Sequence, residues 1–308
     1  MRIGDFTAAY LHLERSGELA LRAARLRAVY RSCRLCPRGC AVDRTRGELG
    51  VCGTPARAVV AAAHPHFGEE RPLVGSGGSG TIFFAGCNLL CAYCQNWQIA
   101  HRRDGDPAGD EELGRIMIGL QEAGCHNINL VTPTHVLPSI VGALRIAIRL
   151  GLRVPLVYNC GGYESLEILR LLDGIVDIYL PDFKYADGAV AARLSSGARD
   201  YPRRAAAAVV EMHRQVGTLV LDDAGIALRG LIIRHLVLPN GLAGTARFVR
   251  FVASRIGREA CLNLMSQYRP EYLAHGIPEI ARPPSAAEYR DALACAARAG
   301  VASRPPGD

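Results

Sequence analysis

The chain has 308 residues, 49% of them hydrophobic and 21% charged, with a formal net charge of +7. This composition is that of a folded globular protein, and it excludes disordered, collagen-like and coiled-coil chains. No apolar run approaches the roughly 18 residues of a membrane span, and the first twenty residues lack the apolar core of a signal peptide; we therefore expect a cytoplasmic protein with no membrane partner.

The N-terminal quarter of the chain predicts one helix followed by a loop-rich segment. Residues 11 to 30 repeat apolar positions at helical spacing, which predicts a single amphipathic helix. A Cys-, Gly- and Arg-rich stretch follows to about residue 57, and the glycine-rich VGSGGSG at 74 to 80 indicates a boundary before the main domain.

Apolar runs alternate with helical patterns over the rest of the chain. The runs predict strands at 81–86, 128–134, 154–160, 176–184, 230–240 and 261–268. The intervening patterns predict helices at 110–123, 136–150, 164–172, 202–215 and 245–256. The stretch 218–230 predicts a small hairpin or extra turn before the fifth strand. Nearly continuous apolar strands separated by helices are typical of a parallel sheet covered by helices.

The sequence therefore predicts an α/β fold: a partial, open (β/α)6 barrel with a small N-terminal Cys-rich metal-binding segment. We place the N-terminal helix and Cys-rich segment at 1–75, the barrel at 76–282, and a C-terminal helix and tail at 283–308. Polar residues cluster where the predicted strands end, and α/β barrels carry their active sites at that end of the strands.

Lysine usage singles out one residue. The 36 basic residues are spread along the chain and include one lysine, Lys184, so the other 35 are arginines. Because arginine and lysine differ in geometry and hydration, a single lysine kept against this bias predicts a specific role. The dispersed charge itself gives little support to a nucleic-acid partner.

The cysteines point to metal. Eleven cysteines are many for a cytoplasmic chain, in which disulfides rarely persist. Seven fall into two groups, Cys33, Cys36, Cys40 and Cys52, and then Cys87, Cys91 and Cys94. The other four lie singly among apolar residues and are expected in the core; they are Cys125, Cys160, Cys261 and Cys295.

The second cysteine group lies in FFAGCNLLCAYCQNW, directly after the first predicted strand. Three thiolates on one loop can hold three corners of a [4Fe–4S] cube and leave the fourth iron without a protein ligand. A structural zinc site takes four ligands and usually pairs one CxxC with a second pair further along the chain. The spacing of Cys87, Cys91 and Cys94 therefore favours an iron–sulfur cluster whose open iron can bind a substrate.

At these residues the chain resembles the radical S-adenosylmethionine superfamily, whose pattern CxxxCxΦC has an aromatic residue, here Tyr93, before the last cysteine. The resemblance implies that the cluster on Cys87, Cys91 and Cys94 chelates S-adenosylmethionine and cleaves it reductively to a 5′-deoxyadenosyl radical. The radical would abstract hydrogen from a substrate. The Tyr93 ring would lie close to the adenine.

The resemblance also implies cofactor-binding positions at the strand ends. INLVTPTH occupies the place of the Gly-Gly-Glu segment of the superfamily, which this chain lacks, so only the location carries over. YNCGGY follows the next strand, and LPDFK resembles the Asp-x-Lys segment of glycyl-radical-enzyme activases, in which the lysine pairs with the methionine carboxylate. The candidate contacts with S-adenosylmethionine are Tyr93, Thr132, Thr134, His135, Asn159, Asp182 and Lys184.

More narrowly, the chain resembles the PflX-type proteins, which are described as predicted pyruvate formate-lyase activating enzymes. CRLCPRGCAVDRTRGELGVCG, HPHFGEE, GCHNINLVTPTH and NLMSQYRP occur in the expected order, and the match covers roughly residues 30 to 275. Cys160 and Arg269 depart from the pattern, which leaves the adenosine contacts of the last strand open. The resemblance implies an electron donor such as flavodoxin or ferredoxin and a protein substrate, a glycyl residue of a partner enzyme.

The first cysteine group has four thiolates in a segment too small to build its own core. Cys33, Cys36, Cys40 and Cys52 therefore predict a second metal site, either a structural zinc or an auxiliary iron–sulfur cluster. A nucleic-acid role for the arginines of this segment lacks the interleaved aromatics that such surfaces carry.

Two classes of function follow from these motifs. We expect a radical S-adenosylmethionine oxidoreductase, of the type that activates glycyl radical enzymes. The alternative is a non-catalytic metal-binding adaptor on a barrel scaffold, which would bind metal through the first cysteine group and leave S-adenosylmethionine intact.

Overall fold

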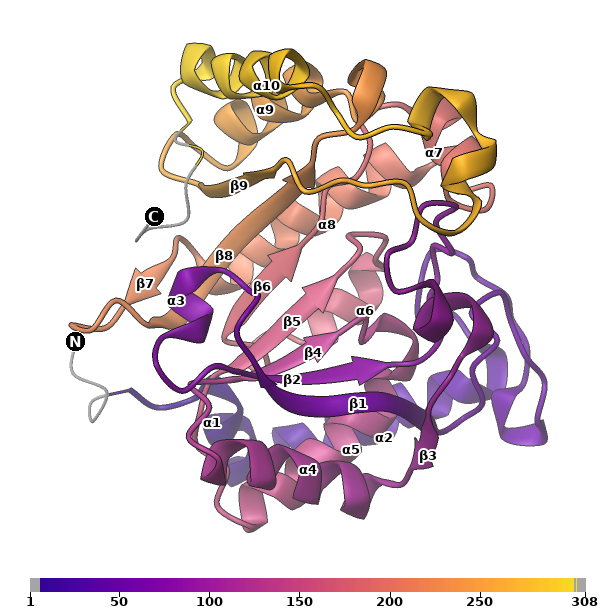
Figure 1. The fold of residues 1–308 in the computed structure, drawn as a ribbon. Helices are drawn as coiled ribbons and strands as arrows, with labels where there is room; N and C mark the ends of the chain where they lie inside the picture. The colour runs from indigo at the N-terminus through magenta and orange to yellow at the C-terminus, as the bar shows by residue number, and fades with distance from the viewer. Residues whose placement is uncertain (1–5, 302, 304–308) are drawn as a thin grey trace.

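The computed structural model describes residues 6–301 and 303. The strands of this part form one sheet in the order β3-β1-β2-β4-β5-β6-β8-β7, with β9 paired to β8 (Figure 1). Its pairings do not return from β9 to the first strands, so among the described residues the sheet is open. The strands are β1 (Ala58–His66), β2 (Ser79–Phe84), β3 (Asp106–Ala108), β4 (Ile128–Val131), β5 (Leu156–Cys160), β6 (Ile178–Pro181), β7 (Val220–Leu221), β8 (Ala227–Leu236) and β9 (Cys261–Met265).

The six strands predicted from apolar runs are confirmed, and they run parallel in chain order. β2, β4, β5, β6, β8 and β9 pair successively with parallel register. Their side chains are almost all buried because both faces of each strand are covered, which is why the runs are continuous instead of alternating. The predicted hairpin also forms, with β7 antiparallel to β8.

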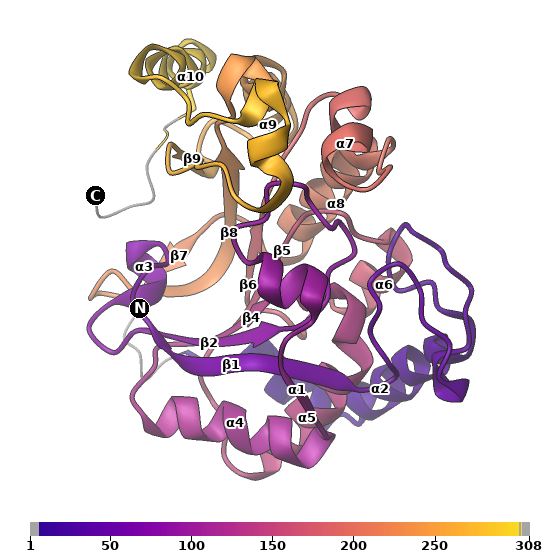
Figure 2. The ribbon, with the colours of Figure 1, turned by 45° about the vertical axis from the view of Figure 1, so that its right-hand side comes forward.

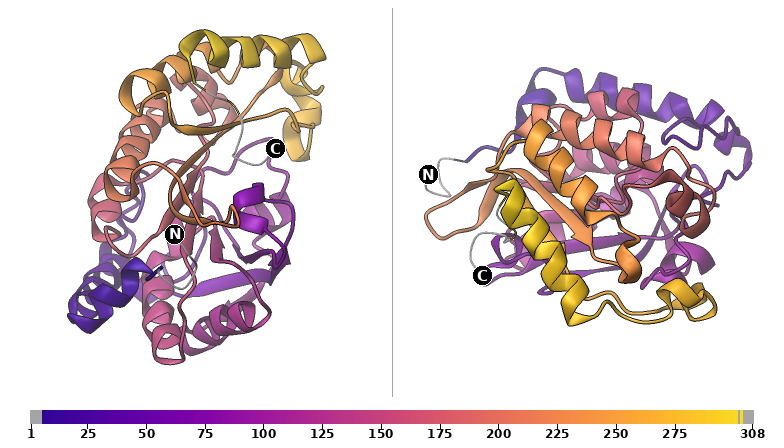
Figure 3. Two further views of the ribbon diagram at one scale, coloured as in Figure 1. Left: turned by 90° about the vertical axis from the view of Figure 1, so that its left-hand side faces the viewer. Right: turned by 90° about the horizontal axis from the view of Figure 1, so that it is seen from above.

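Helices cover the outer face of the curved sheet. In Figure 3 they follow its outer side from α4 to α9, and the five helices expected between the strands are confirmed. α10 packs against α9 and is the expected C-terminal helix. The helices are α1 (Ala9–Arg15), α2 (Glu18–Ala28), α3 (Arg71–Val74), α4 (Asp110–Glu122), α5 (Leu137–Arg149), α6 (Leu166–Leu171), α7 (Gly188–Leu194), α8 (Tyr201–Val216), α9 (Thr245–Arg255) and α10 (Ala286–Ala299).

The expectation of one continuous helix over residues 11 to 30 is wrong. The chain forms α1 and α2 with a break at Gly17, whose φ of +78° is left-handed. Glycine adopts this conformation without steric cost, and it ends helices for that reason. The apolar spacing continues across the break because both helices pack on the same core, α2 against α5.

β1 is a strand that the sequence does not reveal. It runs antiparallel to β2, and β3 pairs with its first residues. The division of the chain at residue 75 stays a prediction, and the β1–β2 pairing crosses it.

The concave face of the sheet has an apolar floor and a polar upper layer. Leu73 of α3 packs with Val157, Ile178 and Ile232, which point from β5, β6 and β8 to the inside. Side chains two residues further along a strand lie on the same face, so Asn159 and Arg234 rise above this floor. None of the described helices has the length and apolarity needed to cross a membrane.

Candidate active site

The cysteines of the loop after β2 line one cavity at the carboxyl ends of the parallel strands. Cys87, Cys91 and Cys94 share a cavity of about 290 Å³ with side chains at the ends of β4, β5, β6, β8 and β9. Gly86, which opens the loop, has φ +86°, and a Cβ there would collide with Thr54 Oγ1. Only glycine fits this backbone, because the N-terminal segment lies so close to the loop.

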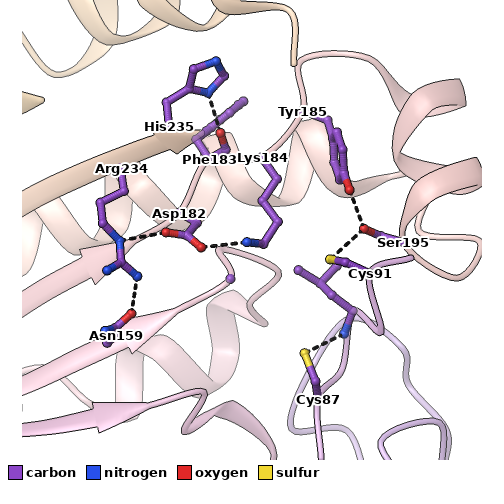
Figure 4. A network of polar contacts seen from close by, with 12 residues as sticks. Cys87, Cys91, Asn159, Asp182, Phe183, Lys184, Tyr185, Ser195, Arg234 and His235 are labelled. Carbon is purple, nitrogen blue, oxygen red and sulfur yellow. Dashed lines mark hydrogen bonds and ion pairs between the residues drawn. The ribbon is translucent and has the colours of Figure 1, made fainter. Parts of the chain in front are cut away.

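Hydrogen-bond donors face two of the three sulfurs. The Leu89 N–H donates to Cys87 Sγ at 3.4 Å, and Ser195 Oγ lies 3.1 Å from Cys91 Sγ (Figure 4). Burial raises the pKa of Cys87 to about 11 and that of Cys94 to about 12, and the Cys91 thiol adds to both shifts. The three thiols are thus near enough to influence one another.

This donor set suits an iron–sulfur cube better than a single ion. Over the described residues, no three His, Cys, Asp or Glu side chains are arranged to hold one metal ion together. The cysteine ligands of a cube bind different irons, so they need not converge on one point. Three soft thiol ligands that face one cavity fit such a group.

A chain of charged side chains crosses the cavity opposite the cysteines. Lys184 Nζ lies 2.7 Å from Asp182 Oδ2, and Arg234 Nε lies 2.8 Å from Asp182 Oδ1 (Figure 4). Arg234 also pairs with Glu69 at 3.0 Å and donates to Asn159 Oδ1. The network places two cations and two carboxylates on the inner face of β5, β6, β8 and the segment after β1.

Asp182, Lys184 and Arg234 hold one another ionised, whereas burial raises the pKa of Glu69. Burial alone would raise the pKa of Asp182, but Arg234 and Lys184 outweigh it and lower the value to about 2. Burial alone would lower the pKa of Lys184, and the Asp182 carboxylate reverses that effect and keeps it well above its usual range. Lys184 therefore stays an ammonium with donors to spare for a ligand carboxylate.

The structure brings together five of the seven candidate cofactor contacts. The cavity lining includes Tyr93, Thr132, Asn159, Asp182 and Lys184. Thr134 and His135 lie outside that lining: Thr134 donates to Glu164 at 2.8 Å, and His135 Nε2 lies 2.8 Å from Ala85 O. Both residues lie in the 3₁₀ turn Thr134–Val136, which separates β4 from α5.

Glu164, the partner of Thr134, is a buried carboxyl. It accepts hydrogen bonds from Thr134 and from the Tyr158 hydroxyl at 3.0 Å. Burial, the largest influence, raises its pKa to about 7 despite these donors. At a pH between the pKa of Glu164 in the unfolded chain and its pKa in the folded chain, the carboxyl is protonated only in the folded chain.

A pH dependence of stability follows. Between the unfolded pKa of about 4.3 and the folded value, the native chain binds more protons, so the free energy of unfolding falls as pH rises through this window. Between pH 5 and 7, we expect the free energy of unfolding to fall by about 2 kcal/mol less in Glu164→Gln than in the wild-type protein. Urea unfolding of both proteins across this range measures the difference, and parallel profiles would contradict it.

The N-terminal cysteines gather at a second, smaller hollow. Cys33, Cys36, Cys40 and Cys52 line it together with His135. The Val51 N–H donates to Cys40 Sγ at 3.5 Å. In Figure 2 this loop segment lies at the side of the sheet, next to α6. None of the eleven cysteines, all within the described part of the chain, forms a disulfide.

A buried arginine faces this hollow. Arg44 is 2% exposed, and its Nη1 donates to His135 O at 2.7 Å and lies 3.9 Å from Cys33 Sγ. Its guanidinium also donates to Pro55 O and lies 4.4 Å from the centre of the Tyr30 ring, and its Nε has no hydrogen-bond partner among the described residues. A buried cation needs a counter-charge, which thiolates in the hollow would supply.

Comparison with known proteins places the chain in a family. No family model matches it. It is 32% identical over 275 residues to Uncharacterized protein MJ0674 of Methanocaldococcus jannaschii, in an alignment covering 86% of this chain and 74% of the archaeal protein. The chain belongs to the family of this archaeal protein.

Solved structures show the fold that the chain shares. A radical SAM methyltransferase from Sphaerobacter thermophilus aligns over 99% of this chain and 94% of its own, with a TM-score of 0.50 and 13% identity. A structure of TYW1 with a lysine-pyruvate adduct bound aligns over 64% of this chain and 69% of its own, with a TM-score of 0.39 and 11% identity. The first alignment shows an α/β fold with a mostly parallel sheet similar to that of a radical SAM protein.

Sequence reasoning missed the central arginine of the site. Arg234 interrupts the apolar run GLIIRHL, which ends the interior strand β8. A charged side chain in a buried strand requires partners, and this signal could have identified it. Ser195 lies in the unremarkable turn after α7, and no local pattern marks it as a neighbour of Cys91.

Proposed function

We propose that the protein is a radical S-adenosylmethionine enzyme. The observation that carries the proposal is that Cys87, Cys91 and Cys94 share one cavity with Lys184, the chain's single lysine. The cavity lies at the carboxyl ends of parallel strands, the usual place of an α/β active site. A metal-binding adaptor would need the thiols but no ligand cavity beside them, so the cavity favours an enzyme.

The cysteines and the cavity have separate tasks in this proposal. Cys87, Cys91 and Cys94 hold the cluster and leave one iron open. When bound, the cluster supplies the electron that splits S-adenosylmethionine into methionine and a 5′-deoxyadenosyl radical. The apolar walls of the cavity, which include Phe83 and Met265, exclude water from the reacting centre.

The polar residues orient S-adenosylmethionine. Lys184 donates to the carboxylate of the methionine moiety, and Asp182 holds the Lys184 ammonium in place. Arg234 fixes Asp182 from the other side. Thr132 and Asn159 offer side-chain oxygens to the amino group, and Tyr93, packed edge-on against two tyrosines, offers its ring to the adenine.

Anaerobic reconstitution tests the proposal. The chain should take up about four irons and four sulfides at the loop after β2, as three thiolates and an open iron require. Electron paramagnetic resonance of the reduced protein should change when S-adenosylmethionine is added. If the protein binds no iron through this loop, or if S-adenosylmethionine leaves the spectrum unchanged, the proposal is contradicted.

The substrate is proposed from the family resemblance. The target would be a glycyl residue of a partner enzyme, with flavodoxin or ferredoxin as electron donor. The open edge of the sheet supports a substrate that enters as a loop of protein chain. Reduced enzyme mixed with S-adenosylmethionine and a glycyl radical partner should give the doublet of a glycyl radical. If S-adenosylmethionine is cleaved but no partner shows the doublet, the glycyl substrate is wrong and the radical chemistry stands.

Lys184→Arg should weaken binding of S-adenosylmethionine about tenfold and leave the cluster intact. The planar guanidinium keeps the charge but loses the compact ammonium that fits between Asp182 and a ligand carboxylate. Anaerobic equilibrium dialysis with labelled S-adenosylmethionine measures the change, and the iron content serves as the control. Equal affinity in the two proteins would mean that Lys184 does not contact the ligand.

We also propose that Cys33, Cys36, Cys40 and Cys52 hold a structural metal group, supported by their shared hollow. Because no three of the described side chains are arranged around one ion, this hollow favours an auxiliary cluster over a zinc ion. Cys36→Ser should lower the melting temperature before it lowers activity, because metal binding orders such a segment. Metal analysis separates the candidates: about one zinc beside four irons indicates a zinc site, and about eight irons without zinc indicates an auxiliary cluster. Four irons and no other metal would contradict a second site.

A further inference from the structure

Ser195 contacts a cluster cysteine from outside the cavity. It caps the C-terminus of α7, and its side chain is fully buried. Its hydroxyl lies 3.1 Å from Cys91 Sγ and 2.8 Å from the Tyr185 hydroxyl (Figure 4). Tyr185 is fully buried as well. Of the three loop cysteines, Cys91 is the one with such a hydroxyl contact in the described part of the chain.

The chemistry of a metal-bound thiolate fixes the direction of these bonds. A thiolate has no proton and only accepts, so Ser195 must donate its O–H to Cys91 Sγ. The Ser195 oxygen is then free to accept, and the Tyr185 phenol, protonated at neutral pH, donates to it. The two hydroxyls form a directed relay that ends on the sulfur.

Arg38, an arginine of the N-terminal Cys-rich segment, holds this relay in place. Arg38, between Cys36 and Cys40, donates to Ser195 O at 3.0 Å and to Ser196 O at 2.6 Å. Its Nε donates to Asn88 O in the cluster loop at 2.8 Å. One guanidinium thus fixes the serine turn and the cluster loop relative to each other.

We propose that Ser195 is a positioning residue that sets the reduction potential of the cluster held by Cys91, with Tyr185 orienting its hydroxyl. The proposal rests on the proposed function, since it requires the cluster. Reduction adds negative charge to the cluster and its sulfurs. A hydrogen bond to a ligating sulfur stabilises that charge more in the reduced state than in the oxidised one, and it raises the potential.

A redox titration of the reconstituted holoenzyme, followed by electron paramagnetic resonance, tests the proposal. At the wild-type midpoint, Ser195→Ala should lower the ratio of reduced to oxidised cluster about tenfold, which is 59 mV for a one-electron couple. Ser195→Thr keeps the hydroxyl and should restore the wild-type ratio. Tyr185→Phe keeps the ring packing, loses the orienting donor and should shift the ratio in the same direction by a smaller factor.

The outcomes separate this inference from the proposed function. If the wild-type protein assembles no cluster, both fall. If Ser195→Ala assembles a cluster with the wild-type midpoint, the relay is overturned and the proposed function stands. Should Ser195→Ala fail to take up iron, the other two variants decide: a lowered ratio in Tyr185→Phe with a wild-type ratio in Ser195→Thr supports the relay, and any other combination overturns it.

Discussion

Replacing Cys91 with alanine is expected to abolish both the reducible cluster and the formation of 5′-deoxyadenosine. Cys91 is the middle ligand of the loop, and it is buried next to Ser195. Among the cavity-lining residues, the one thiol outside the loop is that of Cys160, the last residue of β5. Two remaining thiolates cannot hold a cube with a single open iron. Iron content, the absorbance of the cluster and product analysis measure the loss together.

Cys125→Ala is the matched control for this variant. Cys125 is buried like Cys91, but it does not line the cavity. Removing its sulfur should cost some stability through the small space left behind and should leave iron content and product formation unchanged. Full activity in Cys91→Ala, or equal loss in both variants, would contradict the assignment of the cluster to this loop.

Arg234→Met is expected to destabilise the fold by about 3 to 5 kcal/mol, the usual cost of removing one partner of a buried ion pair. The arginine side chain is 15% exposed and pairs with Asp182 and Glu69. Its removal would leave the mostly buried Glu69 without this cation and Asp182 paired with Lys184 alone. Burial alone would lower the pKa of Arg234, but Asp182, Glu70 and Glu69 outweigh it and hold the pKa above its usual range. Urea unfolding of the purified proteins measures the loss.

Arg214→Met gives the matched control, because Arg214 also pairs with two carboxylates, Asp173 and Glu211, but is 55% exposed. Exposed pairs contribute less than about 1 kcal/mol. Adding Glu69→Gln to Arg234→Met should recover part of the stability, since the carboxylate that lost its arginine partner is then neutral. Equal effects at Arg234 and Arg214 would mean that the buried network does not support the fold.

The parallel sheet was predictable because burial on both faces leaves a strong signal in the sequence. Each of the six parallel strands lies in an apolar run, and all but β9 are rich in β-branched or aromatic residues. β1 gives a weaker signal, because its AVVAAAHPH is rich in alanine and contains Pro65, which both disfavour strands. Pro65 is tolerated since β3 pairs only with residues 58–60, which leaves that edge of the strand free.

The candidate site was predictable where the chemistry is local. The three loop cysteines and Lys184 are marked by spacing and by residue usage. Arg38 and Ser195 meet only because residues about 157 positions apart fold together, and no pattern in the chain encodes that contact. His135 was placed with the ligand contacts by its position after β4, yet it lies in the 3₁₀ turn before α5 and lines the hollow of the N-terminal cysteines.

The most direct test of the account is the anaerobic incubation of the reconstituted, chemically reduced protein with S-adenosylmethionine, followed by quantification of 5′-deoxyadenosine and methionine. The account predicts that both products accumulate in equal amounts, and that they disappear when Cys91 is replaced. A reduced protein with a full complement of iron and sulfide that leaves S-adenosylmethionine intact would contradict it.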